Sequence, residues 1–206
     1  MSKTRIAVLV SGGGTNLQAL IDAQESGVLK SGEIILVISN NSVAYALTRA
    51  ENAGIKALCI SRKDCGSQEG FEEAMLAALK ERDIDLIVLA GFMSILSEHF
   101  VKQYENRIIN VHPSLIPSFC GKGFYGLKVH EAALEYGVKV TGATVHFVNE
   151  VPDGGRIIMQ KAVPVLPDDT PKSLQKRVME REEWVILPEA PELNSNLIKE
   201  DKERRS

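Results

Sequence analysis

Asn110 and His112 stand two residues apart in the stretch 108–117, an apolar run that ends in polar residues and two prolines. On a β-strand, this spacing places both side chains on one face. Pro113 biases His112 toward extended geometry and removes a backbone donor, which ends strand pairing. An amide can donate to a developing oxyanion, and an imidazole can move a proton. The stretch therefore predicts chemistry at a carbonyl, although a core histidine and a turn asparagine would give the same pattern.

A glycine-rich segment lies between the first predicted strand, residues 6–10, and a helix that begins at Thr15. This segment is the run 11–14, Ser-Gly-Gly-Gly. Glycines let a backbone approach a ligand closely, and a helix start offers free N–H groups and a positive dipole end. The segment predicts an anion site, and a phosphate site in particular, unless it is only a tight turn without a ligand.

Two common phosphate-binding motifs do not fit this segment. No Gly-Lys-Ser/Thr follows the glycines, so the segment is not a P-loop. Leu17 stands where the dinucleotide fingerprint has its third glycine. The second predicted strand, 34–39, ends in Asn40 and Asn41 rather than in the acidic residue that would hold a ribose. Binding of NAD is therefore disfavoured.

Other candidate residues lie in loops. Residues 91–96 are unusually apolar, and they either line a pocket for a flat or apolar ligand or pack under the next helix. Residues 118–126 contain several glycines and are predicted to form a mobile lid beside His112. Asp153 is either a turn former or a carboxylate that orients the imidazole and stabilises its charged form. The remaining histidines are interpreted as structural residues on helices or in the core: His99, His130 and His146.

The elements that must position these residues alternate along the chain. Apolar runs predict strands at 6–10, 34–39, 56–60, 84–90, 107–111, 140–148 and 157–165, and amphipathic runs predict helices from Thr15 and at 43–52, 71–82, 97–104, 127–135 and 171–187. This order predicts an α/β fold with an open, mostly parallel twisted sheet and helices on both faces. Ligands bind beyond the carboxyl ends of such strands, where the segments 12–16, 91–96 and 110–112 all lie. Their convergence predicts an active cleft.

The chain length of 206 residues fits a single domain, which we place at 1–190. Pro188 and Pro191 are expected to stop the last helix. The residues beyond them are charged and show no clear periodicity. The predicted division is 1–105 for phosphate binding, 106–190 for catalysis and 191–206 as a polar tail, solvated or disordered.

Composition limits the possible partners and compartment. A net charge of −3 argues against bulk binding of nucleic acid but does not exclude a local anion site. Cys59, Cys65 and Cys120 are odd in number and scattered, which favours reduced thiols and gives no zinc signature. We find no signal-peptide pattern and no apolar stretch long enough for a bilayer span. The expectation is a cytoplasmic protein without membrane or nucleic-acid partners, and a monomer or weak homodimer.

Five motifs together carry a resemblance to a known family. They are residues 11–18 (SGGGTNLQ), 90–97 (AGFMSILS), 110–117 (NVHPSLIP), 142–148 (GATVHFV) and 153–155 (DGG). The chain resembles the glycinamide ribonucleotide formyltransferases of the folate-dependent formyltransferase superfamily, over roughly residues 5–188. The resemblance implies a Rossmann-like formyltransferase fold. It also implies transfer of a formyl group from 10-formyltetrahydrofolate to the amine of glycinamide ribonucleotide in de novo purine biosynthesis.

The resemblance also implies roles for residues that match the motifs. The catalytic set would be Asn110, His112 and Asp153. The substrate phosphate would be held by Gly14, Thr15 and Asn16, and Glu183 would lie near the substrate ribose. The folate pocket would be formed by Met93, Ser94, Ile95, Leu96, Val101, Val148, Asn149 and Asp153. The co-substrate would be 10-formyltetrahydrofolate, with no metal.

The implied mechanism is attack of the amine on the formyl carbon. Asn110 would donate to the oxyanion, and His112 would stabilise it and give a proton to the leaving folate nitrogen. Asp153 should raise the pKa of His112 because it carries the opposite charge. The sequence departs from the family at Ser94 and Gln68, where arginine is frequent, and after Pro188, where the family usually continues with an apolar helix and a hairpin.

Two other functions fit parts of the same pattern. One is a related formyl-folate enzyme, either a formyltetrahydrofolate hydrolase or a formyltransferase that acts on initiator methionyl-tRNA. The sequence shows neither an added regulatory domain nor a basic tRNA-binding extension. The other is a non-catalytic nucleotide- or folate-binding module, against which the intact set of Asn110, His112 and Asp153 argues.

Overall fold

A computed structural model describes the backbone of residues 3–205 and the side chains of 3–198 and 200. Its centre is one sheet of seven strands in the order β3-β2-β1-β4-β5-β6-β7. The strands are β1 Thr4–Val10, β2 Gly32–Ser39, β3 Lys56–Cys59, β4 Leu86–Leu89, β5 Ile108–His112, β6 Val140–Phe147 and β7 Ile157–Pro164. β1 to β5 are parallel, whereas β6 pairs antiparallel with β5 and β7 antiparallel with β6. The predicted α/β fold with a mostly parallel sheet is confirmed.

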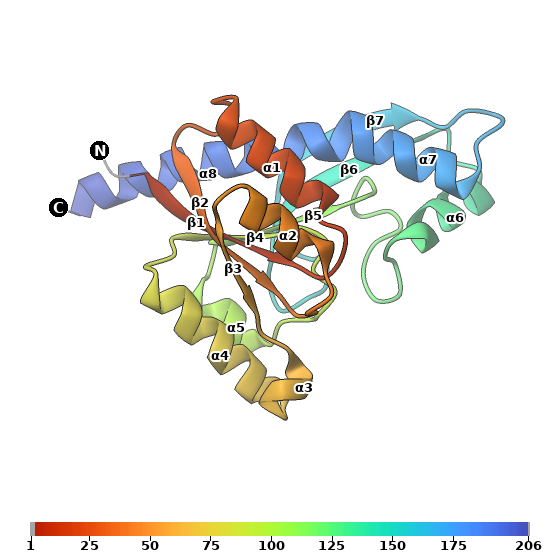
Figure 1. The fold of residues 1–206 in the computed structure, drawn as a ribbon. Helices are drawn as coiled ribbons and strands as arrows, with labels where there is room; N and C mark the ends of the chain where they lie inside the picture. Colours follow the sequence, from red (N-terminus) through yellow and green to blue (C-terminus); the bar gives the residue numbers. More distant parts are fainter. Residues whose placement is uncertain (1–2, 206) are drawn as a thin grey trace.

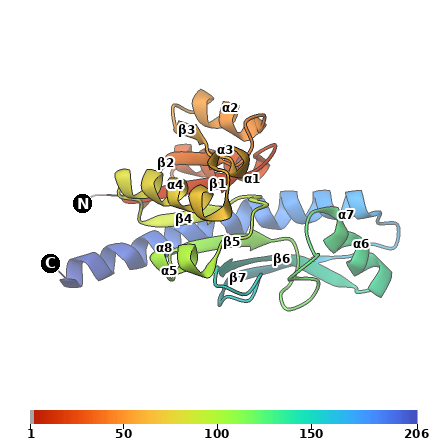
Figure 2. The same cartoon turned by 90° about the horizontal axis from the view of Figure 1, so that it is seen from below.

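Helices cover both faces of the sheet (Figures 1 and 2). They are α1 Thr15–Glu25, α2 Tyr45–Asn52, α3 Arg62–Cys65, α4 Gln68–Glu81, α5 Glu98–Gln103, α6 Leu127–Tyr136, α7 Pro171–Val178, the π-helix η1 Met179–Glu183 and α8 Trp184–Arg205. Alternate residues of β1 face opposite layers, as a strand requires: Ile6 and Val8 pack with α1 and α8, and Leu9 packs with α4 and α5. None of the described helices is both long and apolar enough to cross a membrane.

The end of the chain departs from its predicted form. Pro188 and Pro191 do not stop the last helix, because α8 runs through both of them to Arg205. Both prolines are buried, and Leu187 and Ala190 between and beside them pack in the core. Helix formation at these prolines is therefore favoured by packing that local sequence does not report.

The predicted polar tail is also wrong over its first part. Asn194 and Ser195 are buried, and the Ser195 carbonyl accepts a hydrogen bond from Thr4 Oγ1 at 3.2 Å. The Glu192 carboxylate accepts the backbone N–H groups of Lys30 and Ser31, each at 2.8 Å. Residues 192–195 thus belong to the fold, where they anchor the turn before β2.

Candidate active site

Two of the segments predicted to converge, the glycine-rich segment and residues 91–96, lie side by side at the carboxyl edge of the parallel strands, together with the loop after β2. Ser11, after β1, accepts a hydrogen bond at its Oγ from the backbone N–H of Met93, after β4, at 2.8 Å. Asn40, after β2, donates from Nδ2 to Ser94 Oγ at 2.8 Å. These bonds place the glycine-rich segment, hereafter the glycine loop (residues 11–14), directly beside the 91–96 segment.

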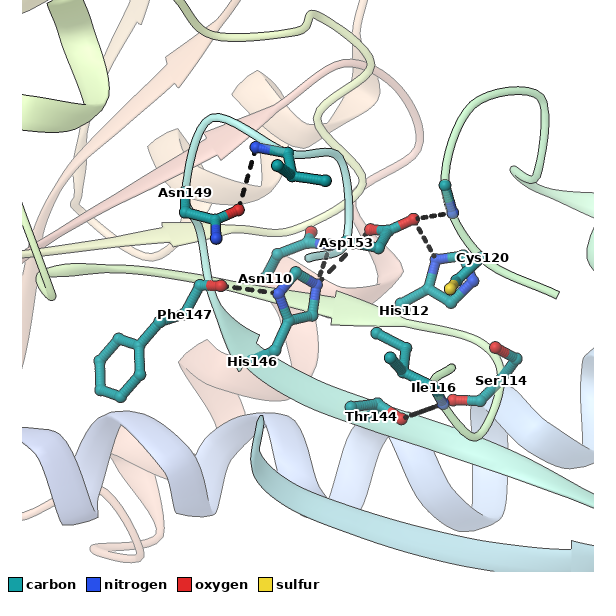
Figure 3. A network of polar contacts seen from close by, with 12 residues as sticks. Asn110, His112, Ser114, Ile116, Cys120, Thr144, His146, Phe147, Asn149 and Asp153 are labelled. Carbon is teal, nitrogen blue, oxygen red and sulfur yellow. Dashed lines mark hydrogen bonds and ion pairs between the residues drawn. The ribbon is translucent and has the colours of Figure 1, made fainter. Parts of the chain in front are cut away.

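A carboxylate between two imidazoles forms the polar centre of the site (Figure 3). Asp153 Oδ2 lies 3.5 Å from His112 Nδ1, and Asp153 Oδ1 lies 3.5 Å from His146 Nε2. Asn110 Nδ2 lies 3.2 Å from the same His146 nitrogen. The antiparallel register of β5 and β6 explains the cluster, because it pairs Asn110 with His146. The structure therefore brings the three predicted catalytic residues together and adds a fourth.

His146 was predicted to be a packed core residue, and this interpretation is incomplete. It is buried, but its Nδ1–H donates to the Phe147 carbonyl at 2.8 Å, which directs Nε2 toward Asn110 and Asp153. The ladder between β6 and β7 shifts register between Val145 and His146. Such bulges re-aim side chains near active sites. No local signal in the sequence marks this residue, because its role depends on pairing across 36 positions.

The turn that carries Asp153 depends on its glycines. Asp153 itself has a φ of 56°, a left-handed conformation that Asp and Asn adopt more readily than most residues. At Gly155, a Cβ atom would lie 1.7 Å from the Phe147 carbonyl oxygen, so only glycine fits there. Asp153 Oδ2 also accepts the Gly121 N–H at 2.8 Å. Asp153 thus adopts a turn conformation and also directs its carboxylate toward His112, so the two alternatives offered by the sequence do not exclude each other.

His112 is buried beside this carboxylate and does not line the cleft described below. Its side chain is nearly inaccessible, with 4% of the residue exposed. Nε2–H donates to the Phe119 carbonyl of the 118–126 segment at 2.9 Å. In a neutral ring, Nδ1 then presents its lone pair toward Asp153. His112 is thus placed to receive a proton at Nδ1, where the carboxylate would stabilise the resulting charge.

The two partners have pKa values below their ordinary ranges. Burial lowers the pKa of His112, and this outweighs the raising effects of the Asp153 charge and the Phe119 carbonyl. Burial raises the pKa of Asp153, but its contacts with His146, His112 and the Gly121 N–H more than offset this and lower it. Asp153 acts on His112 in the predicted direction, yet the net pKa shift of the histidine is downward. At neutral pH the pair is therefore a neutral imidazole beside a carboxylate.

A cleft opens beside this cluster. Its walls include apolar side chains from the 91–96 segment and from the loop after β6, and its polar groups include Asn110, Asn149 and Asp153. Six of the eight residues predicted for the folate pocket line it: Ser94, Ile95, Leu96, Val148, Asn149 and Asp153. The other two do not line it: Val101, on α5, packs in the hydrophobic core, and Met93 is 58% exposed.

Hydrogen bonds of Ser94 and Gln68 hold one wall of this cleft in place. Ser94 Oγ accepts from Asn40, as described above, and Gln68 Nε2 donates to the Ile95 carbonyl at 3.2 Å and to Glu72 Oε1 at 2.7 Å. Glu72 is buried and also accepts the backbone N–H and the hydroxyl of Ser97. Uncharged side chains, Ser94 and Gln68, thus make hydrogen bonds at the two positions where the resemblance would have allowed arginines.

The glycine loop ends at α1 in the expected form. Gly14 precedes the helix with a φ of 72°, and a Cβ atom there would lie 2.7 Å from Ala46 Cβ. Asn16 Nδ2 donates to Glu183 Oε2 at 2.9 Å, and Thr15 Oγ1 lies 3.8 Å from Met179 Sδ, which links α1 to η1. Glu183 is buried, and burial raises the pKa of its carboxyl. The structure therefore brings Gly14, Thr15, Asn16 and Glu183 together.

Residues 4–190 match the family model described as "Formyl transferase". This chain belongs to the formyl transferase family. It is 42% identical to the phosphoribosylglycinamide formyltransferase of Haemophilus influenzae over 89% of this chain and 84% of that protein. It is 47% identical to the human trifunctional purine biosynthetic protein adenosine-3 over 93% of this chain, which spans only 18% of that relative.

Solved structures of formyltransferases have the same fold as this chain. A glycinamide ribonucleotide transformylase from Symbiobacterium toebii matches with a TM-score of 0.87 and 42% identity, over 94% of this chain and 88% of that chain. A phosphoribosylglycinamide formyltransferase from Brucella melitensis matches with a TM-score of 0.86 and 42% identity, over 94% and 96% of the two chains. The formyl transferase fold thus covers nearly the whole chain.

Proposed function

We propose that this chain transfers a formyl group from 10-formyltetrahydrofolate to the amine of glycinamide ribonucleotide, a step of de novo purine biosynthesis. The observation that carries the proposal is the junction of the glycine loop, which leads into the N-terminus of α1, with a cleft lined by Asn110 and Asp153 at one edge of the sheet. The relatives named phosphoribosylglycinamide formyltransferase support the same substrate pair.

The two substrates would occupy different parts of this edge. Gly14, Thr15 and Asn16 would hold the ribonucleotide phosphate, and Glu183 would contact the ribose. The formyl-folate would lie in the cleft, whose apolar walls and few polar groups suit a flat ring with polar edges. When bound, this co-substrate would supply an activated formyl carbon.

The residues of the chain would then do three things. Asn110 can donate a hydrogen bond to the negative charge that develops on the formyl oxygen, since it lines the cleft and keeps a second amide hydrogen beyond its contact with His146. His112 would take up at Nδ1 the proton that the attacking amine loses as its bond to the formyl carbon forms, and would give it to the leaving folate nitrogen as that nitrogen's bond to the formyl carbon breaks. Asp153 would stabilise the charged imidazole. Direct proton transfer from His112 Nε2 would first require its contact with the Phe119 carbonyl to open.

The setting of the reaction is also a proposal. We infer that the protein acts in the cytoplasm on small molecules alone, as a monomer or weak homodimer. The free thiols of Cys59, Cys65 and Cys120 support a reducing compartment, and the net charge of −3 supports partners other than nucleic acid.

The proposal is tested by formyl transfer from 10-formyltetrahydrofolate with three acceptors. These are glycinamide ribonucleotide, water alone and charged initiator tRNA. We expect rapid transfer only with the ribonucleotide. Equal consumption of the folate without ribonucleotide would instead support a hydrolase, and binding of both ligands without turnover would support a non-catalytic module.

A further inference from the structure

The carbonyl side of the glycine loop is held by the segment between β2 and the end of α2. Three consecutive carbonyls accept from three donors: Ser11 O from Asn41 Nδ2 at 3.4 Å, Gly12 O from Ala46 N at 3.1 Å, and Gly13 O from Arg49 Nε at 2.8 Å. Two of these donors lie on α2, which packs beside α1 (Figure 1). The loop is thus tied along one side by a neighbouring βαβ unit.

These bonds also decide where the N–H groups of the loop point. In a planar trans peptide, the N–H points away from the carbonyl of the preceding residue. Fixing the carbonyls of residues 11–13 therefore fixes the N–H groups of residues 12–14 on the opposite side. No described residue accepts a hydrogen bond from these N–H groups, so they remain open to an anion.

Arg49 is itself held firmly for a surface-facing residue. Its Nη1 donates to Gln18 Oε1 on α1 at 2.9 Å, and Gln18 Nε2 donates to Asp22 Oδ1 at 2.8 Å. The guanidinium carbon lies 5.0 Å from the centre of the Tyr45 ring. The Nε–H group of the guanidinium thus binds the glycine loop, and its Nη1 group binds α1, the helix that follows the loop.

We propose that Arg49 is a positioning residue for the substrate phosphate: it holds the Gly13–Gly14 peptide so that the Gly14 N–H faces the anion. This inference rests on the proposed function, because it assumes that the phosphate binds at the glycine loop. Arg49 acts through the loop, and its two-sided contact requires a planar fork rather than charge alone.

The test compares Arg49→Ala with a matched variant, Arg107→Ala. Arg107 also lies over a tyrosine ring, 5.2 Å from that of Tyr104, and also donates to a carbonyl, that of Gln103 at 3.3 Å. It precedes β5, at the edge of the sheet opposite the glycine loop. Arg107→Ala should leave both KM values unchanged.

For Arg49→Ala we expect the KM for glycinamide ribonucleotide to rise about 10- to 100-fold, the range for a lost or misaligned hydrogen bond to a charged group. The kcat at saturation and the KM for the folate should stay within about 2-fold, because the catalytic cluster lies on β5, β6 and their loops. An unchanged ribonucleotide KM in the folded Arg49→Ala variant would overturn the proposal.

Arg49→Lys separates positioning from charge and serves if the alanine variant fails to fold. Lysine keeps the charge but cannot donate to Gly13 and Gln18 through a rigid fork. We expect an intermediate rise in the ribonucleotide KM, whereas full wild-type behaviour would overturn the positioning role.

An NMR titration of ¹⁵N-labelled protein with inorganic phosphate gives an independent readout. The Gly14 amide should shift in the wild type and in Arg107→Ala, but much less in Arg49→Ala. If the wild type transfers no formyl group to the ribonucleotide, the proposed function fails, and this titration still decides the role of Arg49. An equal Gly14 shift in all variants would overturn that role.

Discussion

The glycine loop and the His112 cluster lie at the same edge of one sheet, but they are held in different ways. The glycine loop is fixed through its backbone, by donors from the next βαβ unit within about 40 residues of chain. The His112 cluster is made of the side chains of Asn110 and His112 on β5, His146 on β6 and Asp153 in the loop after β6, with contacts of 3.2–3.5 Å between its ring, amide and carboxylate groups. One region offers fixed N–H groups, and the other offers groups that titrate.

This difference suggests a division of work. Backbone N–H groups keep their charge distribution at any pH, so the glycine loop suits tight and constant binding of a phosphate. A buried imidazole beside a carboxylate can gain and lose a proton, so the His112 cluster suits catalysis. Substitutions in the two regions should therefore change different kinetic parameters.

The largest expected effect is on His112. His112→Ala should lower kcat about 10²- to 10⁴-fold, because it removes a positioned proton-transfer group. Steady-state kinetics beside circular dichroism would measure this, with His99→Ala on the exposed side of α5 as a control. Near-normal turnover in the folded His112→Ala variant would exclude this residue from the mechanism. It would also contradict the assignment of catalysis to the His112 cluster.

A second buried histidine near His112 makes the stability of this region pH-dependent. Burial lowers the pKa of His130 to about 4, and neither of its ring nitrogens has a hydrogen-bond partner among the described residues. The folded state favours the neutral form more strongly than the unfolded state does, so stability is full above about pH 6.5 and is lost as pH falls toward 4. The loss for this residue should be at most about 3 kcal/mol.

His130→Leu tests this expectation, because leucine cannot be protonated and no partner of the ring is left unsatisfied. Urea unfolding at pH 7 and at pH 4.5 would give the free energy of unfolding of both proteins. The wild type should lose more stability than His130→Leu on acidification. If both proteins lost the same free energy of unfolding on acidification, groups other than His130 would control the acid sensitivity.

Contacts of α8 with the turn before β2 should contribute to the stability of the fold. Glu192→Ala leaves the N–H groups of Lys30 and Ser31 without their carboxylate acceptor, at an expected cost of about 1–3 kcal/mol. Glu189→Ala, an exposed position on the same helix, is the control and should cost far less. Equal unfolding midpoints for the two variants would show that the contact between α8 and the N-terminal half contributes little.

The smallest effect concerns Asn16. Asn16→Asp would place a carboxylate against both the substrate phosphate and Glu183, which Asn16 now contacts at 2.9 Å. We expect the KM for glycinamide ribonucleotide to rise about 10-fold, since like-charge repulsion in a partly dry site costs more than about 1 kcal/mol. The KM for the folate serves as the internal reference and should not change. A ribonucleotide KM equal to that of the wild type would argue against phosphate binding at this loop.

The same contrast explains what the sequence could and could not predict. The strand, glycine loop and helix at 6–21 follow from residue types at neighbouring positions, and so does the spacing of Asn110 and His112. The role of His146 depends on the register of two antiparallel strands, which no local pattern encodes. The carbonyl of Phe119 could not be predicted either, because any residue has one.

At the C-terminal helix α8, local signals in the sequence led to a wrong prediction. Pro188 and Pro191 are strong local signals for a helix end, and the polar residues after them are a strong signal for a tail. Burial of Leu187 and Ala190 and the contacts of Glu192 outweigh both signals. Tertiary packing thus overrides propensity where the two disagree.

We propose that the glycine loop binds phosphate and that the His112 cluster performs the transfer. An acceptor that lacks phosphate separates these two roles. We would measure kcat/KM for formyl transfer to glycinamide ribonucleotide and to its dephosphorylated riboside. Several N–H contacts to a charged group should make the ribonucleotide better by about 10²-fold or more. The Asn16→Asp variant should reduce that preference, whereas His112→Ala should slow both acceptors equally. Equal kcat/KM values for the two acceptors in the wild type would contradict the account.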